Sequence, residues 1–249
     1  MPEQNFAGRT AIIVGGASGM GLLAGQDLAK QGATVILADV NGEKVEALAA
    51  DIRANGGNAY GVKCDVRKVE DIENAVAFTR EKGGSVDIMI YTAGGFAGRI
   101  FNCPEPFQSR PYEVLDWGID VNLKGALFFC RAVIGTMIEQ KRGVMIVLGS
   151  IDGVTGSAWS VDYSAAKSGM IGMVKGLALL GAPHNVRACC VSPGPVLTRP
   201  GMANMPTPMG RAAEPQEVVD LILYLASDKA AFISGDNYLI DGARACMVR

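Results

Sequence analysis

Residues 10–21 read Thr-Ala-Ile-Ile-Val-Gly-Gly-Ala-Ser-Gly-Met-Gly, an apolar run followed at once by a glycine-rich turn. A segment of helical periodicity begins at Met20. Glycines permit a tight turn and let backbone N–H groups approach a pyrophosphate, and a helix N-terminus adds partial positive charge. Glycine-rich turns are common, but this one lies between a strand and a helix, which favours cofactor binding over a purely structural turn. The candidate cofactor-binding residues are Gly15, Ser18, Gly19, Met20 and Gly21.

Strands and helices alternate outward from this segment along the chain. The early strands are continuous apolar runs, which is typical of a parallel sheet covered by helices on both faces. The pattern therefore predicts an α/β fold, a doubly wound parallel sheet of about seven strands, with ligands at the carboxyl ends of the strands. The expected strands are Thr10–Val14, Thr34–Ala38, Ala59–Cys64, Val86–Tyr91, Val144–Leu148, Val186–Val191 and Tyr238–Ile240. The expected helices are Met20–Lys30, Glu43–Asn55, Lys68–Lys82, Pro111–Gln140, Ser160–Leu180 and Pro215–Ala226.

Composition limits the class of protein. The 249 residues are 49% hydrophobic and 19% charged, and no linker divides them, so we expect a single globular domain over residues 1–249. The net charge of −2, without a basic run, argues against nucleic acid as a partner. We find no apolar stretch of the ~18 residues that a membrane span needs and no targeting pattern at the start, and we expect a cytoplasmic protein without a membrane segment.

Cysteine and histidine usage argues against a metal site. The six cysteines lack C-x-x-C spacing, and the adjacent Cys189 and Cys190 would point to opposite faces of a strand. Buried free thiols are therefore expected. His184 is the single histidine, so neither a histidine-based zinc site nor a Ser-His-Asp triad is predicted.

Acidic residues end the second and third expected strands. Asp39 can accept hydrogen bonds from both ribose hydroxyls of NAD, and its charge would repel the 2′-phosphate of NADP. The alternative is a cap for the helix near Glu43, for which Asn41 is also a candidate. Asp65, followed by Val66, either reaches the adenine or caps the next helix, and the sequence does not decide between these roles. We favour NAD as the cofactor.

A phenol and an ammonium lie four residues apart in Tyr163-Ser-Ala-Ala-Lys167, on one face if the segment is helical. A nearby cation favours the phenolate and would bring the pKa of Tyr163 toward a useful range. Alone the pattern is weak. Ser150 at the end of the fifth strand and Asn122 in the long fourth helix complete a candidate catalytic set of four polar groups.

In this order the motifs resemble those of the classical short-chain dehydrogenase/reductases, from about Arg9 to Gly242. The matching residues are Gly15, Gly19, Gly21, Asp39, Asp65-Val66, Ala93-Gly94, Asn122, Ser150, Tyr163, Lys167, Pro193-Gly194, Thr198 and Asp241-Gly242. The resemblance implies a Rossmann fold with Tyr163 as acid/base. It also implies that Lys167 binds the nicotinamide ribose and lowers the Tyr163 pKa, that Ser150 orients the substrate oxygen and that Asn122 supports a proton relay. Pro193, Gly194, Val196 and Thr198 would line the nicotinamide.

Three positions depart from the family's pattern. Val14 replaces a usual threonine before the first glycine, Tyr91 replaces an asparagine, and Cys189 stands where asparagine is frequent. The polar side chains missing at Val14 and Tyr91 normally tie the glycine loop to the fourth strand. Their absence questions local packing more than chemistry.

The resulting expectation is an NAD(H)-dependent oxidoreductase that interconverts a secondary alcohol and a ketone. An NADPH-linked 3-oxoacyl carrier-protein reductase is the alternative enzyme, against which Asp39 and the uncharged Ser18 argue. A dinucleotide-binding sensor without catalysis is the non-enzymatic alternative, and the intact set of four polar groups argues against it.

Substrate and assembly are the least determined features. Methionines and prolines crowd residues 198–214, which the resemblance places over the substrate, and aromatic residues lie nearby. We expect a largely uncharged, hydrophobic substrate, cyclic or steroid-like compounds included, although Arg199 would instead favour an acidic one. Small residues in Ser160–Leu180 favour close helix packing, and the resemblance implies a homotetramer.

Overall fold

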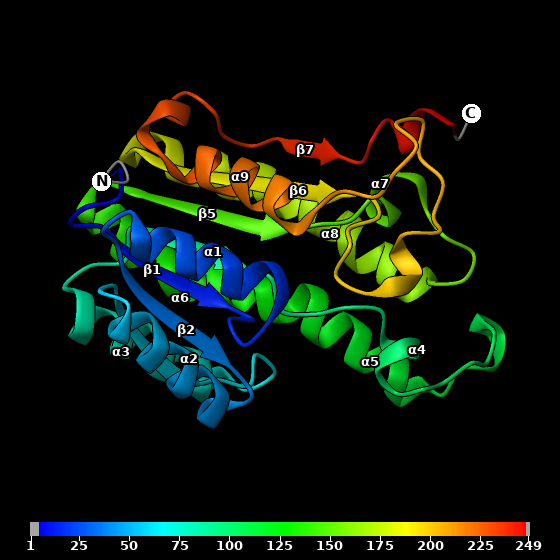
Figure 1. Ribbon diagram of the computed structural model, residues 1–249, viewed down its shortest axis with the longest axis horizontal. Coiled ribbons are helices and arrows are strands. Elements are labelled where there is room, and N and C mark those ends of the chain that lie inside the picture. The colour runs from blue at the N-terminus through cyan, green and yellow to red at the C-terminus, as the bar shows by residue number, and fades with distance from the viewer. Residues whose placement is uncertain (1–4, 248–249) are drawn as a thin grey trace.

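Seven parallel strands form one sheet in the order β3-β2-β1-β4-β5-β6-β7 in the computed structural model, which describes residues 5–247. The chain moves from β1 to one edge, then returns past β1 to β4 and continues to the other edge (Figure 1). This confirms the doubly wound α/β fold and places its switch point between β1 and β4. The strands are β1 (Thr10–Val14), β2 (Thr34–Asp39), β3 (Asn58–Lys63), β4 (Ile88–Tyr91), β5 (Gly143–Leu148), β6 (Val186–Pro193) and β7 (Asn237–Ile240).

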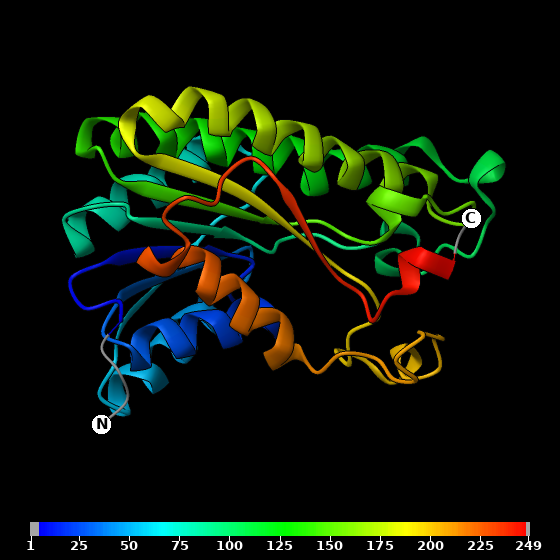
Figure 2. The same ribbon diagram turned by 90° about the horizontal axis from the view of Figure 1, so that it is seen from above.

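Helices cover both faces of the sheet, as Figure 2 shows for α1 and α9 on one side and α6 and α8 on the other. Successive residues of β1 face opposite layers: Ile13 packs in the core beneath α1, α2 and α9, whereas Ile12 and Val14 pack beneath α3, α6 and α8. The helices are α1 (Gly19–Lys30), α2 (Gly42–Ala54), α3 (Val69–Gly83), α4 (Ala97–Ile100), α5 (Tyr112–Ile119), α6 (Gly125–Gln140), α7 (Asp152–Thr155), α8 (Val161–Gly181) and α9 (Pro215–Ala226). The short helices α4 and α7 were not predicted.

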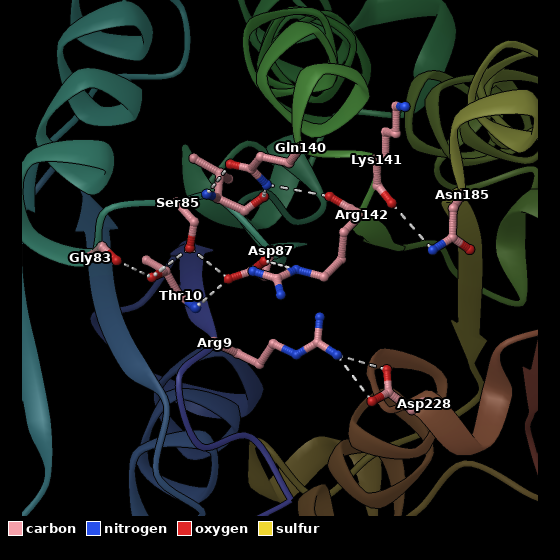
Figure 3. A network of polar contacts seen from close by, with 11 residues as sticks. Arg9, Thr10, Gly83, Ser85, Asp87, Gln140, Lys141, Arg142, Asn185 and Asp228 are labelled. Atoms are coloured by element: carbon pink, nitrogen blue, oxygen red, sulfur yellow. Dashed lines mark hydrogen bonds and ion pairs between the residues drawn. The ribbon is translucent and has the colours of Figure 1, made fainter.

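A polar network at the amino ends of the strands corrects one predicted boundary (Figure 3). The Asp87 carboxylate, 1% exposed, accepts hydrogen bonds from Thr10 N, Ser85 Oγ and Arg142 Nε at 2.8, 2.7 and 2.6 Å. The Val86 N–H donates to Gln140 Oε1, and the Val86 carbonyl accepts from Gln140 Nε2. Because the Gln140 side chain takes both main-chain groups of Val86, this residue does not pair with the sheet, and β4 begins at Ile88 rather than at Val86.

The predicted helix Pro111–Gln140 is interrupted by a π-helical turn at Asp120–Lys124, between α5 and α6. Asn122 Nδ2 donates to the Gly118 carbonyl at 2.8 Å, four residues earlier. That carbonyl would otherwise accept the main-chain N–H of Asn122, so the side chain takes its place and the helix widens locally.

The helical stretch Tyr112–Gln140 is long and apolar enough, by length and composition alone, to cross a membrane. It contains no uninterrupted apolar run of that length, because charged residues such as Lys124 and Arg131 interrupt it. Half of the apolar window is buried in the protein, and Phe129, Val133 and Met137 pack in the core against the sheet. Packing against the sheet therefore accounts for the apolar character of this helix.

The cysteines are free thiols. Cys189 and Cys190 lie in the cores on opposite faces of the sheet, as predicted, and Cys64 and Cys130 are also buried. The prediction of burial was wrong for Cys103, which is half-buried, and for Cys246, which is exposed. Within residues 5–247, the His, Cys, Asp and Glu side chains form no group of three or more that could hold a metal ion.

Candidate active site

A cavity of about 420 Å³ opens at the carboxyl ends of the strands, on both sides of the switch point. Most of the predicted cofactor-binding residues line it: Gly15, Ser18, Gly19, Met20, Gly21, Asp39, Asp65, Val66, Ala93, Gly94 and Thr198. Tyr163, Lys167, Pro193, Gly194 and Val196 are not among its lining residues. Val196 belongs to the buried core, where it is 5% exposed.

The glycine loop passes too close to β4 for side chains. Gly15 has φ +88°, and a Cβ there would lie 2.6 Å from Ala93 N. Gly19 has φ +55° but open space beside it, so the first turn of α1 is uncovered where it lines the cavity. Backbone conformation and close approach therefore both require glycine, and the exposed helix N-terminus suits an anionic group.

Thr92 supplies the connection that the departures at Val14 and Tyr91 put in question. Its hydroxyl donates to the Val14 carbonyl at 2.9 Å, which ties the start of the glycine loop to the end of β4. The Tyr91 hydroxyl is buried and donates to Val121 O at 2.6 Å, in the π-helical turn. The glycine loop is therefore still tied to β4, because Thr92 makes the hydrogen bond that was expected to be missing.

Asp39 lies at the end of β2 and faces the glycine loop. Its carboxylate accepts hydrogen bonds from Ala17 N at 3.2 Å and from Asn41 N at 3.1 Å. Asn41, whose side chain accepts from Lys44 N, caps α2. The alternative role of Asp39 as the helix cap is thus filled by another residue, and its carboxylate is left at the cavity wall.

Asp65 does not cap the helix that follows it, whose N-cap residue is Lys68, and its contact with the adenine stays a prediction. Its carboxylate binds the Arg67 guanidinium at 2.9 and 2.6 Å and accepts from Arg67 N at 3.1 Å. This pairing lowers the pKa of Asp65 and raises that of Arg67. Arg67, the cation that lines the cavity, is therefore already paired with the carboxylate of Asp65.

The phenol, ammonium and hydroxyl predicted as a catalytic set do meet. Lys167 Nζ lies 5.4 Å from the centre of the Tyr163 ring, so the two residues share a face of α8. The Tyr163 hydroxyl is hydrogen-bonded to Ser150. Ser150 lies two residues beyond the end of β5, in the loop before α7, rather than within the strand. Its hydroxyl also accepts from Asp152 N at 3.2 Å.

Asn122 is fully buried and holds the loop that follows β4. Its amide accepts from Gly95 N at 2.9 Å and donates to Gly95 O at 3.0 Å, in addition to the bond to Gly118 O. A Cβ at Gly94 would lie 2.2 Å from Asn122 Oδ1. All three hydrogen bonds go to backbone groups, so in this structure Asn122 positions the cavity wall.

Burial dominates the titration of the catalytic set. It raises the pKa of Tyr163 to about 12, against the hydrogen bond from Ser150, which lowers it. Burial lowers the pKa of Lys167 to about 8, and its ammonium donates to Leu148 O at 2.6 Å. The charges of Arg199 and Arg99 also lower the pKa of Tyr163, and the effect of Lys167 on that pKa stays a prediction.

Several lining residues were missed by sequence reasoning. The lining residues next to the carboxyl ends of strands could have been predicted, because the carboxyl ends of parallel strands meet at the same edge of the sheet. Residues from the loop and helices after β4 carry no local signal. The missed residues are Val14, Ala38, Val40, Cys64, Arg67, Thr92, Ile100, Trp117, Val121 and Leu148.

Comparisons agree with this geometry. The family model described as short chain dehydrogenase matches residues 9–207. An uncharacterized oxidoreductase of Mycobacterium bovis is 35% identical, over 95% of this chain and 96% of its own length. The (2S)-[(R)-hydroxy(phenyl)methyl]succinyl-CoA dehydrogenase subunit BbsD of Thauera aromatica is 32% identical, over 95% and 96% of the two chains. The solved structure of the citronellol catabolism dehydrogenase AtuB of Pseudomonas aeruginosa PAO1 has a TM-score of 0.88 and 29% identity, over 98% of each chain. The protein belongs to the short-chain dehydrogenase family and is an oxidoreductase with a nicotinamide dinucleotide cofactor.

Proposed function

We propose that the protein is an NAD(H)-dependent oxidoreductase that interconverts a secondary alcohol and a ketone. The observation that carries the proposal is the meeting of Tyr163, Ser150 and Lys167 beside the cavity: Lys167 donates to the carbonyl of Leu148, which lines the cavity together with Asp39. The test is NADH oxidation with a panel of ketones, with NAD and NADP compared side by side for the matching alcohols.

The cavity fits a dinucleotide by the chemistry of its donors. The uncovered N-terminus of α1 at Gly19 would hold the pyrophosphate, Asp39 would bind the adenosine ribose, and Lys167 would bind the nicotinamide ribose. The bound nicotinamide supplies the hydride chemistry at the substrate carbon.

Each member of the catalytic set has a separate role. Tyr163 gives its hydroxyl proton to the substrate oxygen in reduction and accepts it back in oxidation. Its raised pKa keeps the phenol protonated at neutral pH, so the proton donor for reduction is present. Ser150 holds the substrate oxygen beside the phenol. Asn122 keeps the loop after β4 in place and, as the resemblance implies, supports a proton relay.

NAD rather than NADP is supported by the charges around the adenosine end. Asp39 contributes a carboxylate there, while Arg67, the cation among the lining residues, is paired with Asp65. A 2′-phosphate would meet a negative charge without a free cation to balance it.

Asp39→Ala is expected to weaken NAD use and improve the relative use of NADP. The change removes the acceptor for the ribose hydroxyls together with the charge that repels a 2′-phosphate. The measurement is the NAD/NADP ratio of kcat/KM, with Asp51→Ala on the exposed face of α2 as the control. An unchanged ratio would assign Asp39 only to holding the glycine loop through Ala17.

Two apolar side chains, those of Trp117 and Met209, support a substrate site that is partly apolar. Trp117 lines the cavity and packs edge-on against Phe101, with ring centres 5.6 Å apart. Met209, in the segment 198–214 that we propose covers the substrate, is an apolar side chain that is 72% exposed. We therefore propose a substrate with a hydrophobic body.

A homotetramer is proposed from the outer faces of α6 and α8. Leu179 and Leu180 are 81% and 55% exposed, and a Cβ at Gly172 or Gly176 would meet open space. Interior glycines each lower helix stability by about 1 kcal/mol relative to alanine, and close packing against a second copy would offset that.

We also propose a cytoplasmic location, since free thiols are typical of a reducing compartment.

Gly172→Phe is expected to shift the protein to a smaller assembly while each subunit stays folded. A Cβ at Gly172 meets nothing within 4 Å in its own subunit, and the added ring would hold a second copy of α8 away. Light scattering at micromolar concentration measures the mass, and Glu73→Phe on the exposed face of α3 is the control. A tetrameric Gly172→Phe variant would contradict the proposed interface, and a monomeric wild type would contradict assembly itself.

A further inference from the structure

Three side-chain polar atoms next to Tyr163 are buried without a hydrogen-bond partner. Within residues 5–247, the atoms in this condition are Arg110 Nε, Asp162 Oδ2 and Ser164 Oγ. Asp162 and Ser164 flank Tyr163 in the first turn of α8, and Arg110, from the loop after β4, is paired with Asp162. Buried polar groups in proteins are almost always hydrogen-bonded, so three exceptions at one place need an explanation.

Arg110 joins two segments that build the site. Its Nη1 lies 3.1 Å from Asp162 Oδ1, and its Nη2 donates to the carbonyls of Glu105 and Trp159 at 3.1 and 3.2 Å. Trp159 lies two residues before the start of α8. One planar guanidinium therefore holds the loop after β4 against both the backbone that enters α8 and the first turn of that helix.

The carboxylate of Asp162 is enclosed by a third segment. A Cβ at Gly118 in α5 would lie 2.6 Å from Asp162 Oδ2, so the α5 backbone passes directly over this oxygen and leaves no space for a side chain. The Gly118 carbonyl accepts the hydrogen bond from Asn122 in the π-helical turn. Asp162 is therefore packed between the guanidinium of Arg110 and the helix that leads to Asn122.

A second set of hydrogen bonds ties the same turn of α8 to Ser150. Ser160 Oγ donates to Asp152 Oδ2 at 3.1 Å, and Asp152 N donates to Ser150 Oγ at 3.2 Å. Ser150 is in turn hydrogen-bonded to the Tyr163 hydroxyl. The residues just before Tyr163 are thus held by Arg110 and by the loop that carries Ser150, and these contacts set where the phenol meets Ser150.

A buried ion pair with unmet hydrogen bonds is a costly way to hold two segments together. The side chains of Arg110 and Asp162 are 1% and 3% exposed, and well-packed apolar residues of similar volume are often at least as stable as such a pair. Apolar packing has no preferred direction, whereas a guanidinium fixes the distance and the angle to each of its acceptors. The pair therefore supplies geometry more than stability.

We propose that Arg110 and Asp162 are positioning residues of the active site. They fix the first turn of α8 so that the Tyr163 hydroxyl meets both Ser150 and the substrate carbonyl. Neither residue is among those that line the cavity, so they act through the backbone of α8 and not by contact with substrate or cofactor. The inference rests on the proposed function, in which Tyr163 exchanges a proton with the substrate, and adds to it an ion pair outside the cavity.

The experiment separates geometry from stability with the apolar double variant Arg110→Met with Asp162→Leu. Its free energy of unfolding should be close to that of the wild type, because no unpaired charge is buried. Its single-turnover rate of ketone reduction should nevertheless be about 10- to 100-fold lower, since a displacement of about 1 Å at a reacting group can cost 10²-fold. The Kd of NADH should stay at the wild-type value, because the residues that line the cavity are unchanged.

Asp87→Ala is the matched control for Asp162→Ala. The Asp87 carboxylate is also buried and paired, with Arg142, but it lies at the amino ends of the strands, away from the cavity (Figure 3). Both single variants should lose stability, whereas only Asp162→Ala should lose turnover per folded enzyme. A wild-type rate in the double variant, or equal losses of rate in the two single variants, would overturn the inference, because the pair would then serve stability alone.

Hydrogen exchange tests the inference without turnover. Backbone amides of residues 159–166 should exchange faster in the double variant than in the wild type, while those of β1 should be unchanged, since a segment held less firmly opens more readily. If the wild type turns over no ketone but residues 159–166 loosen in this way, the proposed function fails and the role of the pair in holding Tyr163 stands. Unchanged exchange in residues 159–166 would overturn the inference.

Discussion

Tyr163→Phe is expected to lower kcat by about 10²–10⁴-fold, the usual contribution of a positioned acid or base. The change removes the hydroxyl that is hydrogen-bonded to Ser150 and leaves the ring beside Lys167. NADH binding should persist, since the residues that line the cavity are untouched. Steady-state turnover with the best ketone of the panel, together with NADH titration by fluorescence, measures both effects.

Tyr224→Phe, on α9, is the matched control, because it removes a tyrosine hydroxyl from a residue far along the chain from the catalytic set. It should retain wild-type turnover. A Tyr163→Phe variant that keeps more than a tenth of the wild-type rate while binding NADH would refute Tyr163 as the acid/base.

Asp162→Ala is expected to lower the free energy of unfolding by about 3–5 kcal/mol, the usual effect of removing one partner of a buried ion pair. Arg110 and Asp162 are 1% and 3% exposed, with Nη1 and Oδ1 3.1 Å apart. The Arg110 guanidinium also donates to the carbonyls of Glu105 and Trp159 and lies 4.9 Å from the Phe96 ring centre. The pair therefore clamps the loop after β4 onto the start of α8, one residue before Tyr163.

Urea denaturation of the variant measures the loss, and Asp228→Ala is the control. Asp228 pairs with Arg9 but is 86% exposed, so its removal should change stability by less than about 1 kcal/mol. The double replacement Arg110→Met with Asp162→Leu should recover much of the lost stability, since no unpaired charge is then buried. Equal effects of Asp162→Ala and Asp228→Ala would show that burial adds nothing to this pair.

Much of the architecture was predictable because it depends on local pattern. The apolar runs of β1 and β2 and the helical periods between them indicate burial on both faces of a sheet, which is enough to predict a doubly wound fold. The glycine loop, Asp39 and the Tyr163–Lys167 spacing were found in the same way, since each lies within a few residues of a strand end or on one helix turn.

The sequence alone determined the fold class, the edge of the sheet where the cavity lies, and which residue types meet there. Tertiary structure decided which partner each polar group takes. Asn122 binds Gly95 and widens its own helix, and Thr92 replaces the connection missing at Val14. The physical reason is that periodicity and propensity act over neighbouring residues, whereas hydrogen bonds and charge pairs join segments far apart in the chain and depend on how the helices and loops pack.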